Sequence, residues 1–247
     1  MEMAIVIPAR LASTRFPRKL LHPVRGKPLI LWTAERVAGE APEMPLFFAV
    51  ADSELAEVLN SAGFQTVMTD PDLPSGTDRI GAANERIGAD LVINVQADEP
   101  LVRRSHIERL AGLLSESDAA MSTLATPCQT AEEYRNPNRV KVVCDRGGYA
   151  LYFSRSPIPF SRDRGVEVDD AWVRTNPCLV HLGLYGYRRE FLAAYPELPR
   201  GPLEDLEKLE QLRALENGHR IAVGRCDEPT MGIDVPEDAE RLVSRLA

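Results

Sequence analysis

The sequence lacks a hydrophobic run long enough to cross a membrane. Its longest apolar run, MPLFFAVA at residues 44–51, is far shorter than the roughly 20 residues that a membrane-spanning helix needs. The first ten residues, MEMAIVIPAR, also lack the basic start and long apolar stretch of a secretory signal. We therefore expect a cytoplasmic protein with no membrane partner.

Cysteine is scarce, and its spacing does not suit a metal site. The sequence has no C-x-x-C pair and no pair of histidines beside any of its cysteines, which are Cys128, Cys144, Cys178 and Cys226. This pattern argues against a structural zinc site and favours reduced, buried thiols.

Basic excess and the common nucleotide-binding motifs are also absent. The formal net charge is -8, which disfavours nucleic acid as a partner because a phosphate backbone requires an extended basic surface. Neither G-x-x-x-x-G-K-[ST] nor G-x-G-x-x-G occurs, so a P-loop ATPase and a dinucleotide oxidoreductase lose their main support.

Ser154 and Ser156 have no histidine and acid in a hydrolase arrangement, so a nucleophilic serine is unsupported.

Apolar strand-like segments alternate with amphipathic helical segments in the first half of the chain. The pattern predicts strands at residues 3–10, 45–51, 64–69 and 90–96, and helices at residues 27–39, 52–63, 77–88 and 104–116. Such alternation predicts an α/β fold with a mostly parallel, Rossmann-like sheet and helices on both faces.

The second half is richer in strands. Strand-like segments at residues 120–126, 139–145, 149–155 and 179–188 predict a smaller mixed or antiparallel excursion, and residues 161–176 look like a polar loop. Helices at residues 202–218 and 236–247 flank a final strand at residues 220–225. Because no segment resembles a linker, we expect a single domain over residues 1–247, with a subregion at about residues 121–190.

A basic loop follows the first predicted strand. Residues 8–19, PARLASTRFPRK, contain Arg10, Arg15, Arg18 and Lys19 and no acid. In parallel sheets, ligands bind beyond the carboxyl ends of the strands, where arginines can grip phosphate oxygens in pairs and Lys19 supplies a point charge. The loop therefore predicts a triphosphate site. The alternative is a solvated basic surface whose charges pair with acids elsewhere.

Two carboxylates stand where a metal bound to a triphosphate could be held. Asp98 follows the apolar run of residues 90–96, and Asp234 precedes a helix that Pro236 begins. Magnesium is a hard ion that accepts a few carboxylates together with phosphate and water oxygens. The pattern predicts a Mg²⁺ site, while a surface turn at Asp98 and a helix cap at Asp234 are the alternatives.

These residues lie within motifs of one known family. The chain resembles the 3-deoxy-manno-octulosonate cytidylyltransferases, or CMP-Kdo synthetases, nearly from end to end. The resemblance is carried, in the family's order, by IPARLASTRFPRKLL, SGTDR, NVQADEPL, NPNRVKVV, YALYFSRSPIPF, HLGLYGYRREFL, PLEDLEKLEQLRALENG and GIDVPEDAERL.

The resemblance implies a nucleotidyltransferase of the lipopolysaccharide pathway that joins CTP and the acid sugar Kdo to give CMP-Kdo and pyrophosphate, with Mg²⁺ required. It implies a homodimer, whose contact we would seek at residues 161–176. CTP would contact Ala9, Arg10, Ser13, Arg15, Lys19, Thr77, Arg79 and Gln96. Lys19, Asp98 and Asp234 would be catalytic, the two aspartates holding metal, and Kdo would contact Arg155, His181, Tyr185, Glu210 and Gln211.

The residues themselves give partial support on the sugar side. On a helix over residues 202–218, Glu210 falls on the apolar arc between Leu203 and Leu206, where a carboxylate needs a partner or a ligand hydroxyl. The alternative is a glutamate at the rim of the arc that reaches water. Arg155 suits a sugar carboxylate by bidentate pairing, or else forms a structural ion pair. His181 lies in an apolar strand, where a histidine satisfied within the core is the alternative.

Some positions depart from the family pattern, and other functions stay open. Leu73 and Pro74 precede SGT, and Ala97 stands in QADEP, where other residues are usual. Other residues are also usual at Arg18, in the basic loop, and at Leu20, directly after it. Two alternatives remain, a cytidylyltransferase for sialic acid or amino-substituted Kdo, and a non-catalytic nucleotide-binding regulator. Comparing turnover on these sugars would separate the first alternative from the main prediction, and a pyrophosphate assay would separate the second.

Overall fold

The computed structural model describes residues 1–245, which form two compact units. Unit 1 comprises residues 1–108, 187–196 and the chain from residue 230 onward, and unit 2 comprises residues 109–186 and 197–229. Both units are built from separated segments, which explains why no linker in the sequence marks a boundary. No helix within residues 1–245 has the length and hydropathy that a bilayer crossing requires.

Unit 1 contains the predicted alternation of strands and helices. Its strands are β1 (Met3–Ala9), β2 (Pro23–Val24), β3 (Lys27–Pro28), β4 (Leu46–Val50), β5 (Gln65–Met68) and β6 (Leu91–Asn94). Its helices are the short 3₁₀ turn η1 (Lys19–Leu21), α1 (Leu29–Glu40), α2 (Ser53–Ser61), α3 (Gly76–Ile87), α7 (Arg189–Ala194) and α10 (Pro236–Arg245). The last two residues of the helix predicted at 236–247 lie outside the described residues.

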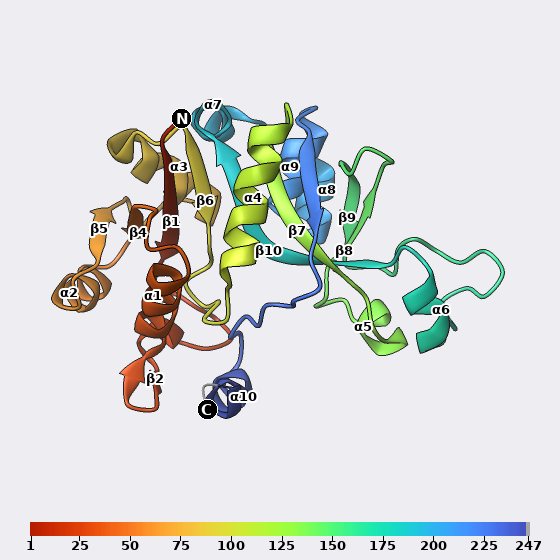
Figure 1. The fold of residues 1–247 in the computed structure, drawn as a ribbon, viewed down its shortest axis with the longest axis horizontal. Helices are drawn as coiled ribbons and strands as arrows, with labels where there is room; N and C mark the ends of the chain where they lie inside the picture. Colours follow the sequence, from red (N-terminus) through yellow and green to blue (C-terminus); the bar gives the residue numbers. More distant parts are fainter. Residues whose placement is uncertain (246–247) are drawn as a thin grey trace. The chain divides into compact units, whose positions relative to one another are not determined.

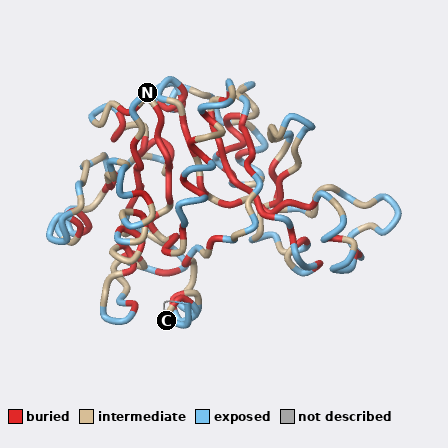
Figure 2. Tube along the Cα trace, viewed as in Figure 1, coloured by how far each residue is buried: buried red, intermediate tan, exposed pale blue. Residues whose placement is uncertain are grey.

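The main strands of unit 1 run parallel in the order β6-β1-β4-β5 (Figure 1). Strands β1 and β6 are buried almost throughout, as apolar runs in parallel sheets are, and Figure 2 shows them as buried segments. Helix α3 packs on β1 and β4, and α2 on β5. Because the strands are parallel, the loops after β1, β4 and β6 leave the sheet at the same edge.

Helix α3 shows how local sequence defines an element at that edge. Ser75 caps its start, because the Ser75 side chain accepts a hydrogen bond from the Asp78 N–H at 3.1 Å. Gly88 ends it in the left-handed conformation with φ 78°, which glycine adopts without a steric cost. The helix therefore begins at the SGT motif of residues 75–77 and ends at Gly88.

Unit 2 is mixed, as predicted. Its strands are β7 (Met121–Pro127), β8 (Lys141–Cys144), β9 (Ala150–Ser154) and β11 (Ile221–Arg225), with most of β10 (Leu179–Arg188). Strand β11 is parallel to β7, whereas β8 is antiparallel to both β9 and β10. Its helices are α5 (Ala131–Arg135), α6 (Asp170–Thr175), α8 (Pro202–Glu207) and α9 (Gln211–Glu216), with most of α4 (Arg104–Glu116). A 3₁₀ turn, η2 (Tyr195–Glu197), falls at a unit boundary.

Two local predictions in unit 2 are wrong. The single helix predicted at residues 202–218 is two helices, α8 and α9, separated at Lys208, which has a left-handed φ of 53°. The segment at residues 161–176 is not loop throughout, because α6 occupies its end, where the Asp169 side chain accepts from the Trp172 N–H at 2.7 Å. The α/β fold class itself is confirmed.

Candidate active site

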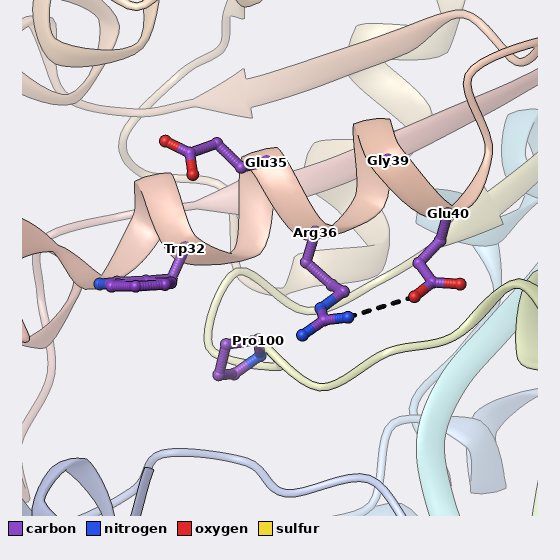
Figure 3. A pocket seen from close by; sticks show the side chains of 6 residues that line it. All are labelled: Trp32, Glu35, Arg36, Gly39, Glu40 and Pro100. Atoms are coloured by element: carbon purple, nitrogen blue, oxygen red, sulfur yellow. Dashed lines mark hydrogen bonds and ion pairs between the residues drawn. The ribbon is translucent and has the colours of Figure 1, made fainter. Parts of the chain in front are cut away.

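A groove of about 390 Å³ lies along helix α1 (Figure 3) and is lined by Trp32, Glu35, Arg36, Gly39, Glu40 and Pro100. None of the predicted site residues lines it. Its charged groups are engaged locally, since Arg36 pairs with Glu40 at 3.2 Å and Lys27 pairs with Glu35 at 2.5 Å. Lys27 also lies over the Trp32 ring. The groove therefore lacks the convergent cationic groups that a triphosphate needs.

The basic loop after β1 is a shaped segment. Phe16 is buried in a cluster with Leu29, Ile233 and Leu242, and the Phe16 carbonyl accepts from the Lys19 N–H at 3.2 Å. The apolar anchor thus fixes the middle of the loop, with the cationic residues Arg15 and Lys19 close to it in sequence.

Lys19, Asp98 and Asp234 meet within unit 1, although they lie far apart in sequence. The Lys19 ammonium donates to the Asp98 carboxylate, lies 3.5 Å from Asp234 Oδ1 and donates to the Ile233 carbonyl at 3.0 Å. Arg15 pairs with the same Asp234 oxygen at 2.8 Å. The loop after β1, the loop after β6 and the segment before α10 therefore form one charged centre.

The donor set of this centre fits magnesium. Both carboxylates already face one cation, the Lys19 ammonium, which is the property that a shared metal site requires of them. Among residues 1–245, no three His, Cys, Asp or Glu side chains gather into a metal-binding group. Mg²⁺ is suited to such a site, because it usually takes one or two carboxylates and completes its shell with phosphate and water oxygens.

The remaining cations of the loop differ in their partners. Arg18 pairs with Glu54 at 2.5 Å on the surface, so the alternative of a basic surface paired with distant acids holds for this residue. Arg10 is exposed and makes no hydrogen bond or ion pair within residues 1–245. Burial lowers the pKa of Arg79, and the like charge of Arg10 lowers it further. An anion near Arg10 would relieve that repulsion.

Arg79 itself holds a loop of its own unit. Its guanidinium donates to Thr69 Oγ1 at 2.5 Å and to the Asp70 carbonyl at 3.0 Å, and the residue is only 2% exposed. These hydrogen bonds fix the Arg79 guanidinium, so Arg79 could contact a nucleotide only from the position that it already occupies. The predicted contact with CTP stays a prediction.

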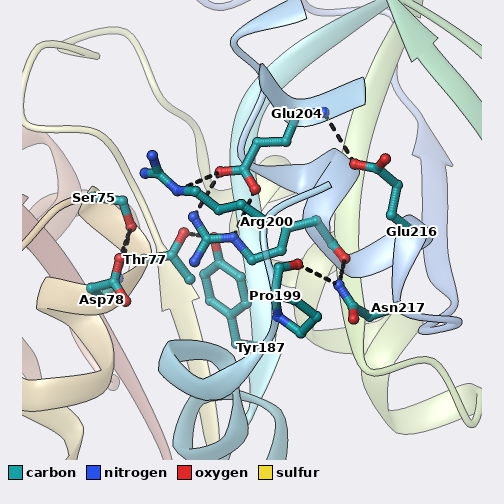
Figure 4. A network of polar contacts seen from close by, with 10 residues as sticks. Ser75, Thr77, Asp78, Tyr187, Pro199, Arg200, Glu204, Glu216 and Asn217 are labelled. Carbon is teal, nitrogen blue, oxygen red and sulfur yellow. Dashed lines mark hydrogen bonds and ion pairs between the residues drawn. The ribbon is translucent and has the colours of Figure 1, made fainter. Parts of the chain in front are cut away.

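The other predicted nucleotide contacts are also in unit 1. Thr77 lies in the first turn of α3, with its hydroxyl 3.4 Å from that of Tyr187 (Figure 4). Ala9 is buried at the end of β1, where its carbonyl accepts from the Ala51 N–H. Gln96 follows β6 and donates to Asn94 Oδ1 at 3.1 Å, while Ser13 is partly exposed in the basic loop.

In unit 2, Tyr185 and Gln211 come together. The Tyr185 hydroxyl donates to Gln211 Oε1 at 3.2 Å, and Gln211 is 4% exposed. The Gln211 Nε2 group is buried and has no hydrogen-bond partner among residues 1–245. A buried amide donor without an acceptor costs free energy, so this position favours a ligand or ordered water that supplies an oxygen.

His181 lies between aromatic rings, with ring centroids 4.9 Å from Phe153 and 5.4 Å from Tyr185. Its Nε2 atom is 2.9 Å from Thr123 Oγ1, and Thr123 can give its only hydroxyl proton to the Leu184 carbonyl at 2.8 Å. His181 Nε2 is then the donor to Thr123, which leaves Nδ1 as the acceptor of the ring. Burial lowers the pKa of His181 to about 3, so the ring is neutral at pH 7.

The neutral state of His181 predicts a loss of stability in acid. An unfolded histidine has a pKa near 6.5, so between about pH 6.5 and 3 only the unfolded chain binds this proton. The free energy of unfolding should therefore fall with pH, by at most about 1.4 kcal/mol per unit from this residue. Urea unfolding at pH 7.5 and 5.0 checks it, with His181→Asn expected to lose less stability than the wild type. Equal losses in both proteins would contradict it.

Glu210 does not lie on a buried apolar arc, and the alternative of a glutamate that reaches water holds for it. Glu210 is exposed at the start of α9, and Leu203 and Leu206, which were to define its apolar arc, are 37% and 81% exposed. The reason is the break at Lys208, which rotates the second half of the segment relative to the first. Its predicted contact with Kdo stays a prediction, without the support of burial.

The buried carboxylate of this segment is Glu204 instead, which the sequence analysis missed. Glu204 is 5% exposed and pairs with Arg213, which donates to it through Nε at 2.8 Å and Nη2 at 2.6 Å. Figure 4 shows Glu216 reaching the start of α8, where its carboxylate accepts from the N–H groups of Leu203 and Glu204 at 3.0 Å each. A Cβ at Gly201 would clash with that carboxylate, so the approach requires glycine.

Two further charged residues of unit 2 were missed. Lys141 is fully buried within β8, and Glu207, at the end of α8, accepts hydrogen bonds from the segment that carries Arg155. A lysine within the apolar run VKVV was the available signal for the first. Nothing in the acid-rich helix singled out the second.

Comparison with known proteins places this geometry in a family. The family model described as Cytidylyltransferase matches residues 4–221. A 3-deoxy-manno-octulosonate cytidylyltransferase of Syntrophotalea carbinolica is 46% identical over 247 residues, covering 100% of this chain and 99% of that protein. An 8-amino-3,8-dideoxy-manno-octulosonate cytidylyltransferase of Shewanella baltica is 41% identical, covering 100% and 99%. A CMP:2-keto-3-deoxy-manno-octonic acid synthetase solved in complex with CTP is 35% identical, with a TM-score of 0.90 over 100% of this chain and 98% of that one.

Proposed function

The chain belongs to the 3-deoxy-manno-octulosonate cytidylyltransferase family, and we propose that it transfers CMP from CTP to the anomeric hydroxyl of Kdo, releasing pyrophosphate. It is a nucleotidyltransferase, and a role in lipopolysaccharide biosynthesis would follow from this product. The observation that carries the proposal is the convergence of Lys19, Asp98 and Asp234 beside the basic loop. That centre offers cations for phosphates and carboxylates for a metal in one place.

The proposed reaction is direct in-line attack. The anomeric oxygen bonds to the α-phosphorus of CTP, the bond from that phosphorus to the β-phosphate oxygen breaks, and the hydroxyl proton passes to solvent water. Arg10, Arg15 and Lys19 would neutralise the charge that grows on pyrophosphate as it leaves, which is the main contribution of proteins to phosphoryl transfer. No protein nucleophile is required.

We propose Mg²⁺ as the cofactor, held by Asp98 and Asp234. When bound, the metal would neutralise phosphate charge and orient reacting oxygens. Lys19 now occupies both carboxylates, so in this proposal its ammonium moves toward a phosphate oxygen when CTP and metal bind. Arg15, which pairs with Asp234, is placed to follow it.

Recognition of the acid sugar is proposed for unit 2. Arg155 would pair with the sugar carboxylate, and the buried Gln211 amide and the acceptor nitrogen of His181 would take sugar hydroxyls. Tyr185 holds the Gln211 oxygen and so fixes the direction of its amide donor. These are neutral or cationic groups, as an anionic ligand requires.

We also propose a homodimer with its contact near residues 161–176. Phe160, directly before this segment, and Val166, within it, are 64% and 39% exposed, which leaves apolar side chains that a partner subunit could cover. Sedimentation equilibrium of the protein tests this proposal, and a monomer at micromolar concentration would refute it.

Pyrophosphate release tests the function. CTP, ATP, GTP and UTP are each combined with Kdo, 8-amino-Kdo and sialic acid, with and without Mg²⁺. We expect turnover with CTP and Kdo only, and a loss of activity in EDTA that added Mg²⁺ restores. Preference for 8-amino-Kdo would assign the substrate of the Shewanella relative instead, and tight CTP binding without pyrophosphate would indicate a regulatory protein.

A further inference from the structure

Arg155 is held through both of its peptide groups by charged side chains. The Arg155 N–H donates to Glu207 Oε2 at 2.9 Å, and the Arg155 carbonyl accepts from the Lys141 ammonium at 2.8 Å. One carboxylate and one ammonium thus fix the backbone on either side of a single side chain. Such an arrangement restricts the backbone from which the guanidinium extends.

Glu207 holds more than the backbone. Its Oε1 atom accepts from Ser154 Oγ at 2.5 Å, and Ser154 Oγ in turn accepts from the Ser156 N–H at 3.0 Å. The Glu207 main-chain carbonyl, at the end of α8, accepts from Arg155 Nε at 2.7 Å. Burial alone would raise the pKa of Glu207, but the hydrogen bonds that its carboxylate accepts from Ser154 Oγ and from the Arg155 N–H hold this pKa below its usual value. The carboxylate is therefore ionised at neutral pH and accepts through both oxygens.

Lys141 completes the arrangement from the other side. It is fully buried, and its ammonium gives its three protons to the carbonyls of Asn136 at 2.8 Å, Arg139 at 2.5 Å and Arg155. The loop that it holds also contains Pro137, whose carbonyl accepts from Arg155 Nη1 at 3.1 Å. Lys141 thereby fixes both the backbone of Arg155 and the acceptor for its side chain.

These contacts leave one edge of the guanidinium available. Nε is used by the Glu207 carbonyl and one proton of Nη1 by Pro137, while Nη2 has no hydrogen-bond partner within residues 1–245. Nη2 therefore keeps two donor protons and Nη1 keeps one, and these two nitrogens can both donate to a sugar carboxylate. A misaligned guanidinium would lose one of the two bonds.

We propose that Glu207 and Lys141 are positioning residues that set the orientation of Arg155 for the carboxylate of the acid sugar. This inference rests on the proposed function. Both charged groups are consumed by internal hydrogen bonds, so they act through Arg155 and not on the substrate. Their loss should weaken sugar recognition while leaving CTP recognition, which is proposed for residues of unit 1, unchanged.

The test is steady-state kinetics of Glu207→Gln and Lys141→Met in the full-length protein. A glutamine cannot accept from both Ser154 and the Arg155 N–H, because one of its terminal atoms is a donor. We expect KM for the acid sugar to rise at least tenfold, with KM for CTP within twofold of the wild type. Asp118→Asn is the matched control, because it removes one carboxylate of an exposed ion pair of unit 2 and should change neither KM.

A double-mutant cycle separates positioning from general structural support. In an Arg155→Met background, Glu207→Gln should change KM for the sugar less than twofold, since the side chain that it positions is gone. If Glu207→Gln retains its full effect there, or raises both KM values equally, the proposal is overturned. Should Lys141→Met fail to fold, the Glu207 cycle decides alone.

Failure of the proposed function has a different signature. If the wild type releases no pyrophosphate with CTP and any acid sugar, the function fails, and the positioning role falls with it. If the wild type is active and Glu207→Gln keeps a normal KM for the sugar, only the positioning role falls.

Discussion

Asp98→Asn is expected to reduce pyrophosphate release from CTP and Kdo by about 10³-fold or more. Asp98 contacts the Lys19 ammonium and is one of the two carboxylates that we propose for Mg²⁺. Asparagine keeps the size of the side chain but removes its negative charge. The substitution therefore both weakens the proposed metal site and removes the ion pair with Lys19. Single-turnover pyrophosphate release at saturating CTP and Mg²⁺ measures the effect.

Glu43→Gln is the matched control for Asp98→Asn. Glu43 is an exposed carboxylate of unit 1 that pairs with Arg104 at 2.6 Å, so its loss makes the same change in net charge away from the charged centre. It should retain wild-type turnover. If the turnover of Asp98→Asn stays within tenfold of the wild type, Asp98 has no catalytic role.

Where the sequence predicted the structure, periodicity and chain order sufficed. The run MAIVIPA forms β1 and LVIN forms β6, because a short apolar run bounded by loops is readily buried as a strand inside a parallel sheet. Asp98 lies in the loop after β6, which ends at Asn94, and parallel strands bring their following loops to one edge. The meeting of Asp98 with Lys19 could therefore be anticipated, whereas the distance to Asp234 depended on where α10 packs.

Where the prediction failed, tertiary contacts overrode the local pattern. A continuous helix through Lys208 would require the Glu207 carbonyl to accept from the Gln211 N–H, but this carbonyl accepts from Arg155 Nε. The competing donor lies more than fifty residues away in sequence, so no helical periodicity could reveal it. The same break exposes Glu210 and leaves Glu204 as the buried carboxylate.

The basic loop shows that two interpretations can hold together. Arg18 forms a surface pair with Glu54, as in the alternative of a solvated basic face. Arg15 and Lys19 also have acidic partners, but these are the aspartates of the proposed metal site. A sequence shows that cations are clustered, but which acids approach them depends on the assembled fold.

Arg213→Leu is expected to lower the free energy of unfolding of unit 2 by about 3–5 kcal/mol. Arg213 and Glu204 are 3% and 5% exposed and share two hydrogen bonds. Leucine would leave a buried carboxylate whose remaining cation is Arg200, at 3.6 Å and with a half-exposed side chain. The cost arises mainly from the unpaired buried charge, and only in small part from the lost attraction.

Urea unfolding in a Trp32→Phe background measures this cost. The chain has two tryptophans, and removing Trp32 leaves Trp172 of unit 2 as the reporter. The double variant Glu204→Leu/Arg213→Leu should be more stable than Arg213→Leu, because removing both charges also removes the unpaired one. A cost below about 1 kcal/mol for Arg213→Leu, or a double variant as unstable as the sum of the two single variants, would show that the pair is not a coupled unit within the fold.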